Sequence, residues 1–372
     1  MITITGPRQS GKTTLAKSFF SSKPYVSFEN PDVREEAITD PRSFLARYSN
    51  GAIFDEVQRF PALLSYLQQI VDEGSQTCRF ILTGSQQFGL RSGISQSLAG
   101  RTAIIHLLPF SFEEVYHTGK KPSLEKALFT GLYPPVHDRH LDPHRWYADY
   151  IQTYIERDVR QLLNIRDLSQ FQLFLKMCAA RTGLLLNLSQ TGADCGISHN
   201  TAREWLSILE ASYIVFRITP YFNNLGKRLV KTPKLYFYDS GLAAWLIGIR
   251  SSDQLLTHSS RGALFESYIA SELVKNSFNR GDTPSIYFWR DRSGNEVDFL
   301  IDKGITVIPI EVKSGKTVAS DWFTGLKNWK TFAGDRAETG MLVYGGDDTY
   351  KREDIMVTSW NKLPASPELN KP

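Results

Sequence analysis

A glycine-rich loop close to the start of the chain has the residue types and spacing that bind phosphate. Its sequence, GPRQSGKT, fits the pattern G-x-x-x-x-G-K-[ST] and lies between an apolar run and a helical pattern. Glycines allow backbone N–H groups to curl around phosphate oxygens, and the following helix directs its positive end at them. We expect Lys12 to reach the β and γ oxygens and the Thr13 hydroxyl to ligate Mg²⁺. The residues predicted to bind the phosphates are Gly6, Pro7, Arg8, Gln9, Ser10, Gly11, Lys12, Thr13 and Thr14.

Two acidic residues follow the apolar run from Gly51 to Phe54 and are candidates for binding Mg²⁺ and activating water. At such a strand end the first acid, Asp55, holds Mg²⁺, and the second, Glu56, polarises the water that attacks the phosphate. An apolar run followed by acids also occurs by chance, but here it lies downstream of the glycine loop. The combination predicts hydrolysis of a nucleotide rather than binding alone.

Further polar residues are candidates for completing the site. Ser85 and Thr83 end the next apolar run, and either hydroxyl fits the role of holding the attacking water or sensing the γ-phosphate. Either also fits a strand-end cap equally well; we assign the catalytic role to Ser85. Arg101 and Arg157 are the arginines expected to approach the phosphates, although a surface or ion-paired arginine explains each at least as well.

Charged residues in the last third of the chain indicate a separate metal-dependent site. Asp298 belongs to the expected strand Glu296–Ile301, while Glu311 and Lys313 lie two residues apart on the next strand and share a face. The acidic pair is expected to hold Mg²⁺ while Lys313 stabilises or activates a nucleophilic water, and Glu266 contributes from the preceding helix. The pattern is loose and also arises by chance on hairpins whose strands end in charges.

The first segment, up to about Tyr116, must position the glycine loop and the acids. Short apolar runs alternate there with helical patterns, which predicts a parallel sheet with helices on its faces. The expected strands are Ile2–Thr5, Ala52–Phe54, Phe80–Thr83 and Ala103–Leu107, and the expected helices are Thr13–Phe20 and Leu63–Val71.

The middle of the chain changes to helical periodicity and then to a mixed pattern. A helical bundle or lid is expected from about Pro122 to Ala180. Short helices over Leu188–Gly196 and Ser198–Glu210 have helix-turn-helix spacing. Two β-rich runs follow, Tyr213–Thr219 and Lys234–Tyr238, and the polar loop between them is typical of the wing of a winged helix.

Basic residues in this winged-helix pattern are candidates for contacts with double-stranded DNA. They are Arg203 in the second helix and Lys227, Arg228 and Lys231 in the wing loop. A winged helix that docks a protein partner, or that only packs between other domains, agrees with the pattern about as well as one that binds DNA. After it, a helix over Ala263–Phe278 and the strands Ile286–Arg290, Glu296–Ile301 and Val307–Lys313 predict a compact α/β unit.

Composition limits the class of protein. The 372 residues carry 43 Lys and Arg against 39 Asp and Glu, and 41% are hydrophobic, which excludes disorder as the main state. No apolar stretch is long enough to cross a bilayer, and the N-terminus lacks the features of a signal peptide. Three scattered cysteines fit neither a disulfide framework nor a zinc site. A cytoplasmic protein without a membrane partner is expected.

Taken in order, these motifs resemble the bacterial and archaeal AAA+-type ATPases that join an N-terminal P-loop domain to a C-terminal domain of unknown function. The resemblance rests on residues 6–14, 54–58, 82–85, 98–101, 155–158, 234–242 and 310–315. It implies an α/β fold in which an AAA+-like P-loop sheet with a helical lid precedes a winged-helix unit and a small restriction-endonuclease-like α/β domain. The order of Glu266, Asp298 and Glu-x-Lys is similar to the PD-(D/E)XK nuclease superfamily, with Val297 in place of the proline.

The resemblance implies an ATPase that uses ATP and Mg²⁺ and couples hydrolysis to a DNA-interacting winged-helix and nuclease-like module. The alternative is a nucleotide-dependent switch that binds a protein partner and has an inactive nuclease-like domain; an oligomer fits either. Family members usually carry a longer segment before the first strand, so a truncated N-terminus and a less covered adenine are expected. The expected domains are the P-loop ATPase domain 1–120, lid or connector 121–185, winged-helix-like domain 186–250 and nuclease-like domain 251–372.

Overall fold

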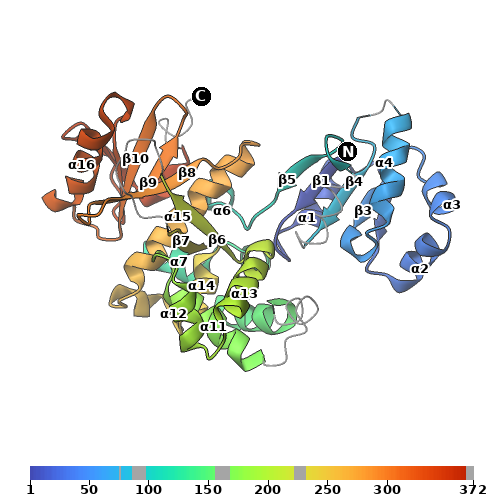
Figure 1. Ribbon diagram of the computed structural model, residues 1–372, viewed down its shortest axis with the longest axis horizontal. Coiled ribbons are helices and arrows are strands. Elements are labelled where there is room, and N and C mark those ends of the chain that lie inside the picture. The colour runs from blue at the N-terminus through green and yellow to red at the C-terminus, as the bar shows by residue number, and fades with distance from the viewer. Residues whose placement is uncertain (75–76, 86–97, 156–167, 222–231, 366–372) are drawn as a thin grey trace. The chain divides into compact units, whose positions relative to one another are not determined.

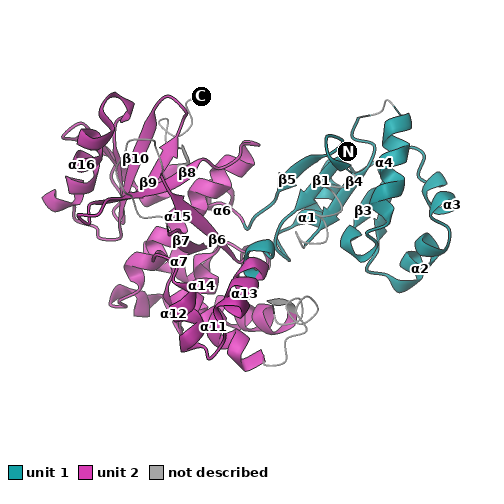
Figure 2. Ribbon diagram, in the orientation of Figure 1, with its two compact units in different colours: residues 1–109, 209–213 teal, residues 110–208, 214–372 magenta. Residues whose placement is uncertain are grey.

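The computed structural model describes residues 1–74, 77–85, 98–155, 168–221 and 232–365 (Figure 1). The chain divides into two compact units, coloured separately in Figure 2. The first consists of residues 1–109 and 209–213, and the second of residues 110–208 and 214–372. The glycine loop and the acids after Phe54 therefore belong to the first unit, and the charged residues of the last third belong to the second.

A five-stranded sheet in the order β2-β3-β4-β1-β5 forms the centre of the first unit. Every pairing in it is parallel, which confirms the α/β sheet expected from the sequence. Ligands of such sheets bind beyond the carboxyl ends of the strands, where both the glycine loop and Asp55 lie. The strands are β1 (Ile2–Thr5), β2 (Tyr25–Ser27), β3 (Ile53–Asp55), β4 (Ile81–Gly84) and β5 (Ala103–His106).

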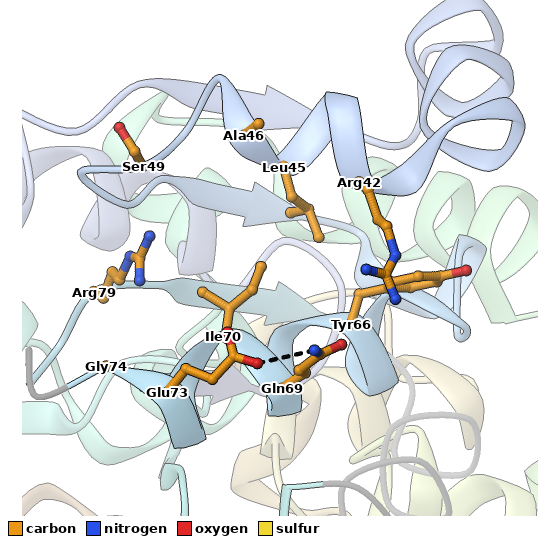
Figure 3. A pocket seen from close by; sticks show the side chains of 10 residues that line it. All are labelled: Arg42, Leu45, Ala46, Ser49, Tyr66, Gln69, Ile70, Glu73, Gly74 and Arg79. Atoms are coloured by element: carbon orange, nitrogen blue, oxygen red, sulfur yellow. Dashed lines mark hydrogen bonds between the residues drawn. The ribbon is translucent and has the colours of Figure 1, made fainter.

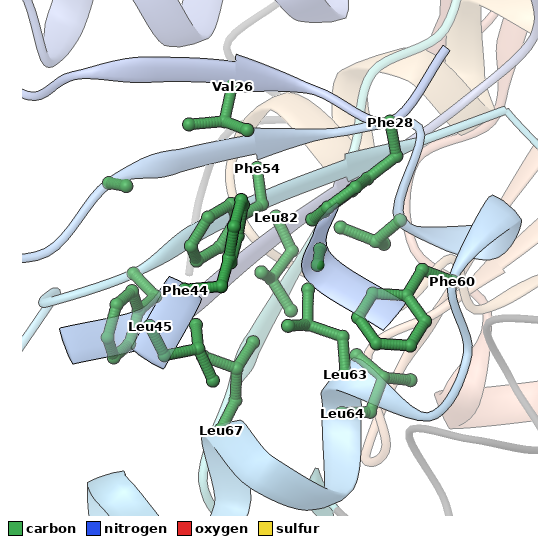
Figure 4. Close-up of a cluster of buried hydrophobic side chains, with 14 of the residues drawn as sticks. Val26, Phe28, Phe44, Leu45, Phe54, Phe60, Leu63, Leu64, Leu67 and Leu82 are labelled. Atoms are coloured by element: carbon green, nitrogen blue, oxygen red, sulfur yellow. The ribbon is translucent and has the colours of Figure 1, made fainter. Parts of the chain in front are cut away.

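Helices bury both faces of the neighbouring strands β3 and β4, because these strands are apolar on both sides. Ile53 and Ile81 pack with Ala16 of α1 on one face. Phe54 and Leu82, one residue further along each strand, turn to the opposite face and its larger apolar cluster (Figure 4). This packing fixes the end of β3, which carries Asp55. The helices are α1 (Lys12–Phe19), α2 (Pro31–Thr39), α3 (Pro41–Ala46) and α4 (Leu63–Glu73).

Residues 209–213 belong to the first unit although they are distant in sequence. The hydroxyl of Tyr213 lies 2.7 Å from Thr5 Oγ1 and 2.9 Å from His106 Nδ1. Tyr213 is buried and has a left-handed backbone, with φ 56°. These bonds attach the segment to the carboxyl ends of β1 and β5.

The first half of the second unit is helical, and several helix ends are specified locally. Ser111 begins α6 with a capping box, in which its hydroxyl accepts from the N–H of Glu114 and its own N–H donates to the Glu114 carboxylate. Asn187 caps α12 in a similar way by accepting from the N–H of Gln190 at 3.0 Å. Gly196, with φ 68°, lies in the turn between α12 and α13.

These helices agree with the helical middle region and the helix-turn-helix spacing of the sequence. They are α6 (Phe112–Tyr116), α7 (Leu124–Thr130), α8 (Pro134–Asp138), α9 (Pro143–Tyr150), the π-helical turn Ile151–Ile155, α11 (Leu168–Ala180), α12 (Leu188–Asp194) and α13 (His199–Ala211). The α-helices later in the described part of the chain are α14 (Ser240–Leu246), α15 (Arg261–Asn279) and α16 (Thr324–Ala333).

An eight-stranded mixed sheet in the order β12-β13-β11-β10-β9-β8-β6-β7 forms the rest of the second unit. β9 pairs antiparallel with β8 and with β10, whereas β11 is parallel to β10. β6 and β7 form an antiparallel pair, and β6 also pairs with β8, so this hairpin is continuous with the larger sheet. The strands are β6 (Val215–Pro220), β7 (Lys234–Phe237), β8 (Ile286–Arg290), β9 (Glu296–Asp302), β10 (Val307–Lys313), β11 (Met341–Tyr344), β12 (Tyr350–Arg352) and β13 (Ile355–Ser359).

Two helices hold the central strands of this sheet in place. Trp329 of α16 packs on Trp289 of β8 in an apolar cluster that also contains Val297 and Leu342. α15 packs against β7 and β10. The three elements that carry the predicted charged residues, α15, β9 and β10, are therefore anchored by buried apolar contacts.

Candidate functional site

The glycine loop joins β1 to α1 through backbone that favours glycine at two points. A Cβ added to Gly6 would lie 1.9 Å from the carbonyl oxygen of Leu107. Gly11 precedes α1 with φ 92°, a left-handed conformation that glycine adopts without strain. The pattern of glycines therefore follows from the tight curl of this loop.

Lys12 lies within that curl. Its side chain is buried, and Nζ donates hydrogen bonds to the carbonyl oxygens of Gly6 at 3.0 Å and Pro7 at 2.5 Å. The nearby hydroxyl of Ser10 is buried without a hydrogen-bond partner in the described part of the chain. A buried ammonium beside an unsatisfied hydroxyl suits the oxygens of a phosphate, since buried polar groups are normally hydrogen-bonded.

Asp55, at the end of β3, is held by four donors. Thr13 Oγ1 donates to its Oδ2 at 3.0 Å, and the hydroxyl of Tyr25 donates to the same oxygen at 2.6 Å. Thr83 Oγ1 and the backbone N–H of Glu56 donate to Oδ1. The Thr13 hydroxyl and the Asp55 carboxylate are hard oxygen ligands in contact with each other, so the residues present fit Mg²⁺.

Glu56 adopts a left-handed backbone, with φ 55°, directly after Asp55. Burial raises the pKa of its carboxyl group, and the positive charges of Arg8 and Lys12 oppose that rise. Gln58 Nε2 donates to Glu56 Oε2 and lies 3.4 Å from Ser85 Oγ. Gln58 thus connects the predicted water-activating acid to the predicted sensor, a role that the sequence analysis did not assign.

The remaining candidates near the phosphate site have different surroundings. The Thr83 hydroxyl is engaged by Asp55, which leaves Ser85 as the strand-end hydroxyl beside Gln58. Arg101 forms two hydrogen bonds with the Asp72 carboxylate of α4, at 2.6 and 2.9 Å. This arginine is ion-paired in the structure. Arg157 lies outside the described residues.

A cavity of about 390 Å³ lies on the first unit between α3 and α4 (Figure 3). It is lined by Ser49, which precedes β3, and by Arg79, which precedes β4. It therefore lies at the amino ends of the strands, at the opposite edge of the sheet from the glycine loop. The cavity is separate from the phosphate site.

The charged residues predicted in the last third meet on β9 and β10 of the second unit. Lys313 Nζ lies 2.5 Å from Glu311 Oε1 and 4.0 Å from Asp298 Oδ2. The N–H of Val312 donates to Asp298 Oδ2 at 2.8 Å, which fixes that carboxylate next to the pair. The structure brings these three predicted residues together.

Glu266 faces the same group of charges from α15, but its Oε1 is already occupied by donors from β7. Lys234 Nζ donates to it at 3.0 Å and the Tyr236 hydroxyl at 2.6 Å. Lys234 Nζ also lies 2.5 Å from Glu296 Oε1. The sequence analysis did not assign Lys234 and Tyr236 to this site; the available signal was their spacing of two on an apolar strand, which places them on one face. We call Lys234, Glu266, Glu296, Asp298, Glu311 and Lys313 the carboxylate cluster.

Burial and the neighbouring negative charge shift the pKa of two acids in this cluster, Glu266 and Glu311. Burial, with a further contribution from the Asp298 charge, raises the pKa of Glu266 to about 7 and that of Glu311 to about 8. Glu311 Oε2 is buried without a hydrogen-bond partner among the described residues. No group of three or more His, Cys, Asp or Glu side chains in the described part of the chain is arranged to hold a metal ion.

The structure describes one of the four residues predicted to contact DNA. Arg203 is exposed on α13. Lys227, Arg228 and Lys231 lie outside the described residues. Among the helices that the structure describes, none combines the length and apolar character needed to cross a membrane.

Known proteins match this chain along most of its length. Residues 1–116 match an AAA domain, residues 121–253 a domain of unknown function (DUF8612), and residues 261–363 a second one (DUF4143). The chain is 31% identical over 320 residues to the uncharacterized protein Rv2008c of Mycobacterium tuberculosis. The aligned region covers 85% of this chain and 71% of the relative. The uncharacterized protein Mb2031c of Mycobacterium bovis matches with the same values.

The chain belongs to this AAA-domain family. An AAA-type domain followed by a C-terminal domain of unknown function is the architecture expected from the motifs. AAA domains bind ATP, usually with Mg²⁺, so the match over residues 1–116 implies nucleotide binding by that part of the chain. A solved structure, that of protein VC1899 from Vibrio cholerae, is 12% identical and covers 98% of this chain and 95% of its own, but its TM-score of 0.23 is too low to support an argument about the fold.

Proposed function

We propose that this AAA-domain protein hydrolyses ATP in the presence of Mg²⁺ at the carboxyl edge of the first unit's sheet. The observation that carries the proposal is the 3.0 Å hydrogen bond between Thr13 Oγ1 and Asp55 Oδ2. It joins the end of the glycine loop to the acid that follows β3. Thr13 and Asp55 would hold Mg²⁺, which neutralises phosphate charge when bound.

The remaining residues have separable roles in this reaction. Backbone N–H groups of the glycine loop bind phosphate oxygens, and Lys12 neutralises charge on the β- and γ-phosphates. Glu56 orients the attacking water and accepts its proton, while Gln58 holds the Glu56 carboxylate in place. The water oxygen bonds to the γ-phosphorus, and ADP leaves with the electrons of the broken phosphorus–oxygen bond.

The decisive experiment is ATP turnover by the purified chain with Mg²⁺ and with EDTA. Phosphate release that requires Mg²⁺ and is absent from Asp55→Asn supports the assignment. Turnover that persists in Asp55→Asn at the wild-type rate would show that another site hydrolyses the nucleotide.

We propose further that ATP hydrolysis is coupled to an interaction of the second unit with DNA. Support comes from the order of its charged residues, with Glu266 on a helix, Asp298 on the next-but-one strand and Glu311-Val312-Lys313 on the strand paired with it. Lys313 contacts Glu311, as an activating lysine requires. Arg203, exposed on α13, can contact a phosphate backbone.

A second candidate function is favoured by Lys234. This buried lysine neutralises Glu266 and Glu296, so Glu266, one of the acids expected to serve a metal, is already paired with a resident cation. A nucleotide-dependent switch that binds a protein partner and cuts nothing agrees with that pairing.

One set of reactions distinguishes the two functions. Supercoiled DNA is incubated with the chain, Mg²⁺ and ATP, and both phosphate release and nicking are measured. Stimulated turnover with nicking that disappears in the double variant Asp298→Ala/Lys313→Ala supports the coupled nuclease. DNA-independent turnover with intact DNA supports the switch.

A further inference from the structure

We propose that Tyr25 is a positioning residue for magnesium, because its hydroxyl fixes the orientation of the Asp55 carboxylate. This inference rests on the proposed ATPase function and extends it to a residue outside the glycine loop and outside the acidic strand end. Tyr25 lies on β2, which the sequence analysis did not identify as a strand.

The register of the sheet explains how Tyr25 reaches Asp55. Tyr25 pairs with Ile53 in the parallel ladder between β2 and β3. Side chains alternate along a strand, so Asp55 lies on the same face as Ile53, the face covered by α1. The Tyr25 side chain therefore extends along this face, and its hydroxyl lies 2.6 Å from Asp55 Oδ2.

A second contact holds the ring from the side of α1. Lys17 Nζ lies 3.5 Å from the centre of the Tyr25 ring, a cation–π contact from the helix that begins with Lys12 and Thr13. The ring is thus held by a helix residue while its hydroxyl is held by Asp55.

The donors to Asp55 differ in whether they would also contact the metal ion once a nucleotide is bound. Thr13 is shared with the metal, and Glu56 contributes only its backbone N–H. Thr83 on Oδ1 and Tyr25 on Oδ2 are the side chains that hold the two carboxylate oxygens from outside the nucleotide machinery. Together these two hydroxyls determine the rotation of the Asp55 carboxylate plane. Removing a hydrogen-bond partner of a metal-binding carboxylate commonly lowers metal affinity or activity by about 10–100-fold.

The test uses Tyr25→Phe in the full chain, which keeps the ring under Lys17 and removes only the hydroxyl. Binding of Mn²⁺, as a paramagnetic substitute for Mg²⁺, is measured by electron paramagnetic resonance in the presence of ADP. We expect the Kd for Mn²⁺ to rise about tenfold, while ADP affinity in EDTA stays at the wild-type value. Tyr66→Phe, the same change on α4 beside the cavity of Figure 3, serves as the matched control and is expected to bind Mn²⁺ like the wild type.

The outcomes separate this inference from the proposed function. Wild-type Mn²⁺ affinity in Tyr25→Phe would overturn the positioning role and leave the ATPase assignment standing. A wild-type chain that binds no Mn²⁺ together with ADP would overturn the ATPase assignment and this inference with it. If Tyr25→Phe lost ADP affinity in EDTA by the same factor as it lost Mn²⁺ affinity, the hydroxyl would have a general structural effect. That result would also overturn the positioning role.

Discussion

Lys234 of β7 and Glu266 of α15 form a buried ion pair at 3.0 Å, although 32 positions separate them in the chain. The same ammonium lies 2.5 Å from Glu296. Lys234 therefore compensates the charge of Glu266 and shares that of Glu296 with Arg290, which lies 3.5 Å from the second oxygen of Glu296.

Replacing Lys234 with methionine should destabilise the second unit. The substitution keeps a long side chain but leaves Glu266 without its cation and Glu296 with Arg290 alone. Breaking a buried pair in this way costs about 3–5 kcal/mol. Urea unfolding followed by tryptophan fluorescence measures the effect, because all seven tryptophans belong to the second unit. Lys327→Met, at an exposed pair with Glu353, should change the midpoint little. Equal midpoints for Lys234→Met and wild type would contradict the assigned compensation.

The stability of the second unit should fall as pH rises. Folding raises the pKa of Glu311 from 4.5 to about 8, so the folded state binds more protons than the unfolded state between these values. The stabilising contribution is complete below pH 4.5 and is lost as pH rises through about 8. Unfolding in EDTA at several pH values measures this slope, and Glu311→Gln should flatten it. A slope unchanged by that variant would assign the pH dependence to other groups.

Lys12→Ala should abolish ATP turnover without unfolding the chain. The substitution removes the ammonium that lies in the curl of the glycine loop, 3.0 Å from the Gly6 carbonyl oxygen. Phosphate release measures the loss of ATP turnover, and the thermal unfolding midpoint measures whether the chain stays folded. Lys120→Ala, at an exposed position of the second unit, is the control and should retain wild-type turnover. Substantial turnover by Lys12→Ala would refute the assigned phosphate site.

Glu56→Gln should bind ATP yet hydrolyse it about 10²–10⁴ times more slowly, which is the usual contribution of a general base. Because burial raises the pKa of Glu56 above 4.5, the reactive carboxylate is lost as pH falls through that raised value. The acid limb of kcat against pH should therefore lie above the position expected for an exposed glutamate. Glu35→Gln on α2, an exposed position, should leave both rate and profile unchanged. A rate for Glu56→Gln close to the wild type would exclude Glu56 as the base.

The phosphate site was predictable because its residues lie in two short stretches of consecutive residues, the glycine loop and the acids after β3. The conformation of Gly6 and Gly11, the start of α1 at Lys12 and the acids after β3 depend on local backbone and on short apolar runs. The elements between α1 and β3 were not predicted. β2 has only three residues, and α2 and α3 each begin at a proline and are short, so their periodicity is weak. The same holds for β11, β12 and β13, which are short strands at the end of the chain.

By itself the sequence determined that a phosphate-binding loop and an acidic strand end occur in one α/β domain, and that acids and a lysine recur on later strands. Tertiary structure alone decided which side chains meet. The contact of Tyr25 with Asp55 depends on the parallel register of β2 and β3, and that of Lys234 with Glu266 depends on α15 packing against β7. The physical reason is that a strand alternates its faces at every residue, so a register shift of one reverses each such contact. Only the packing of the apolar cores selects that register.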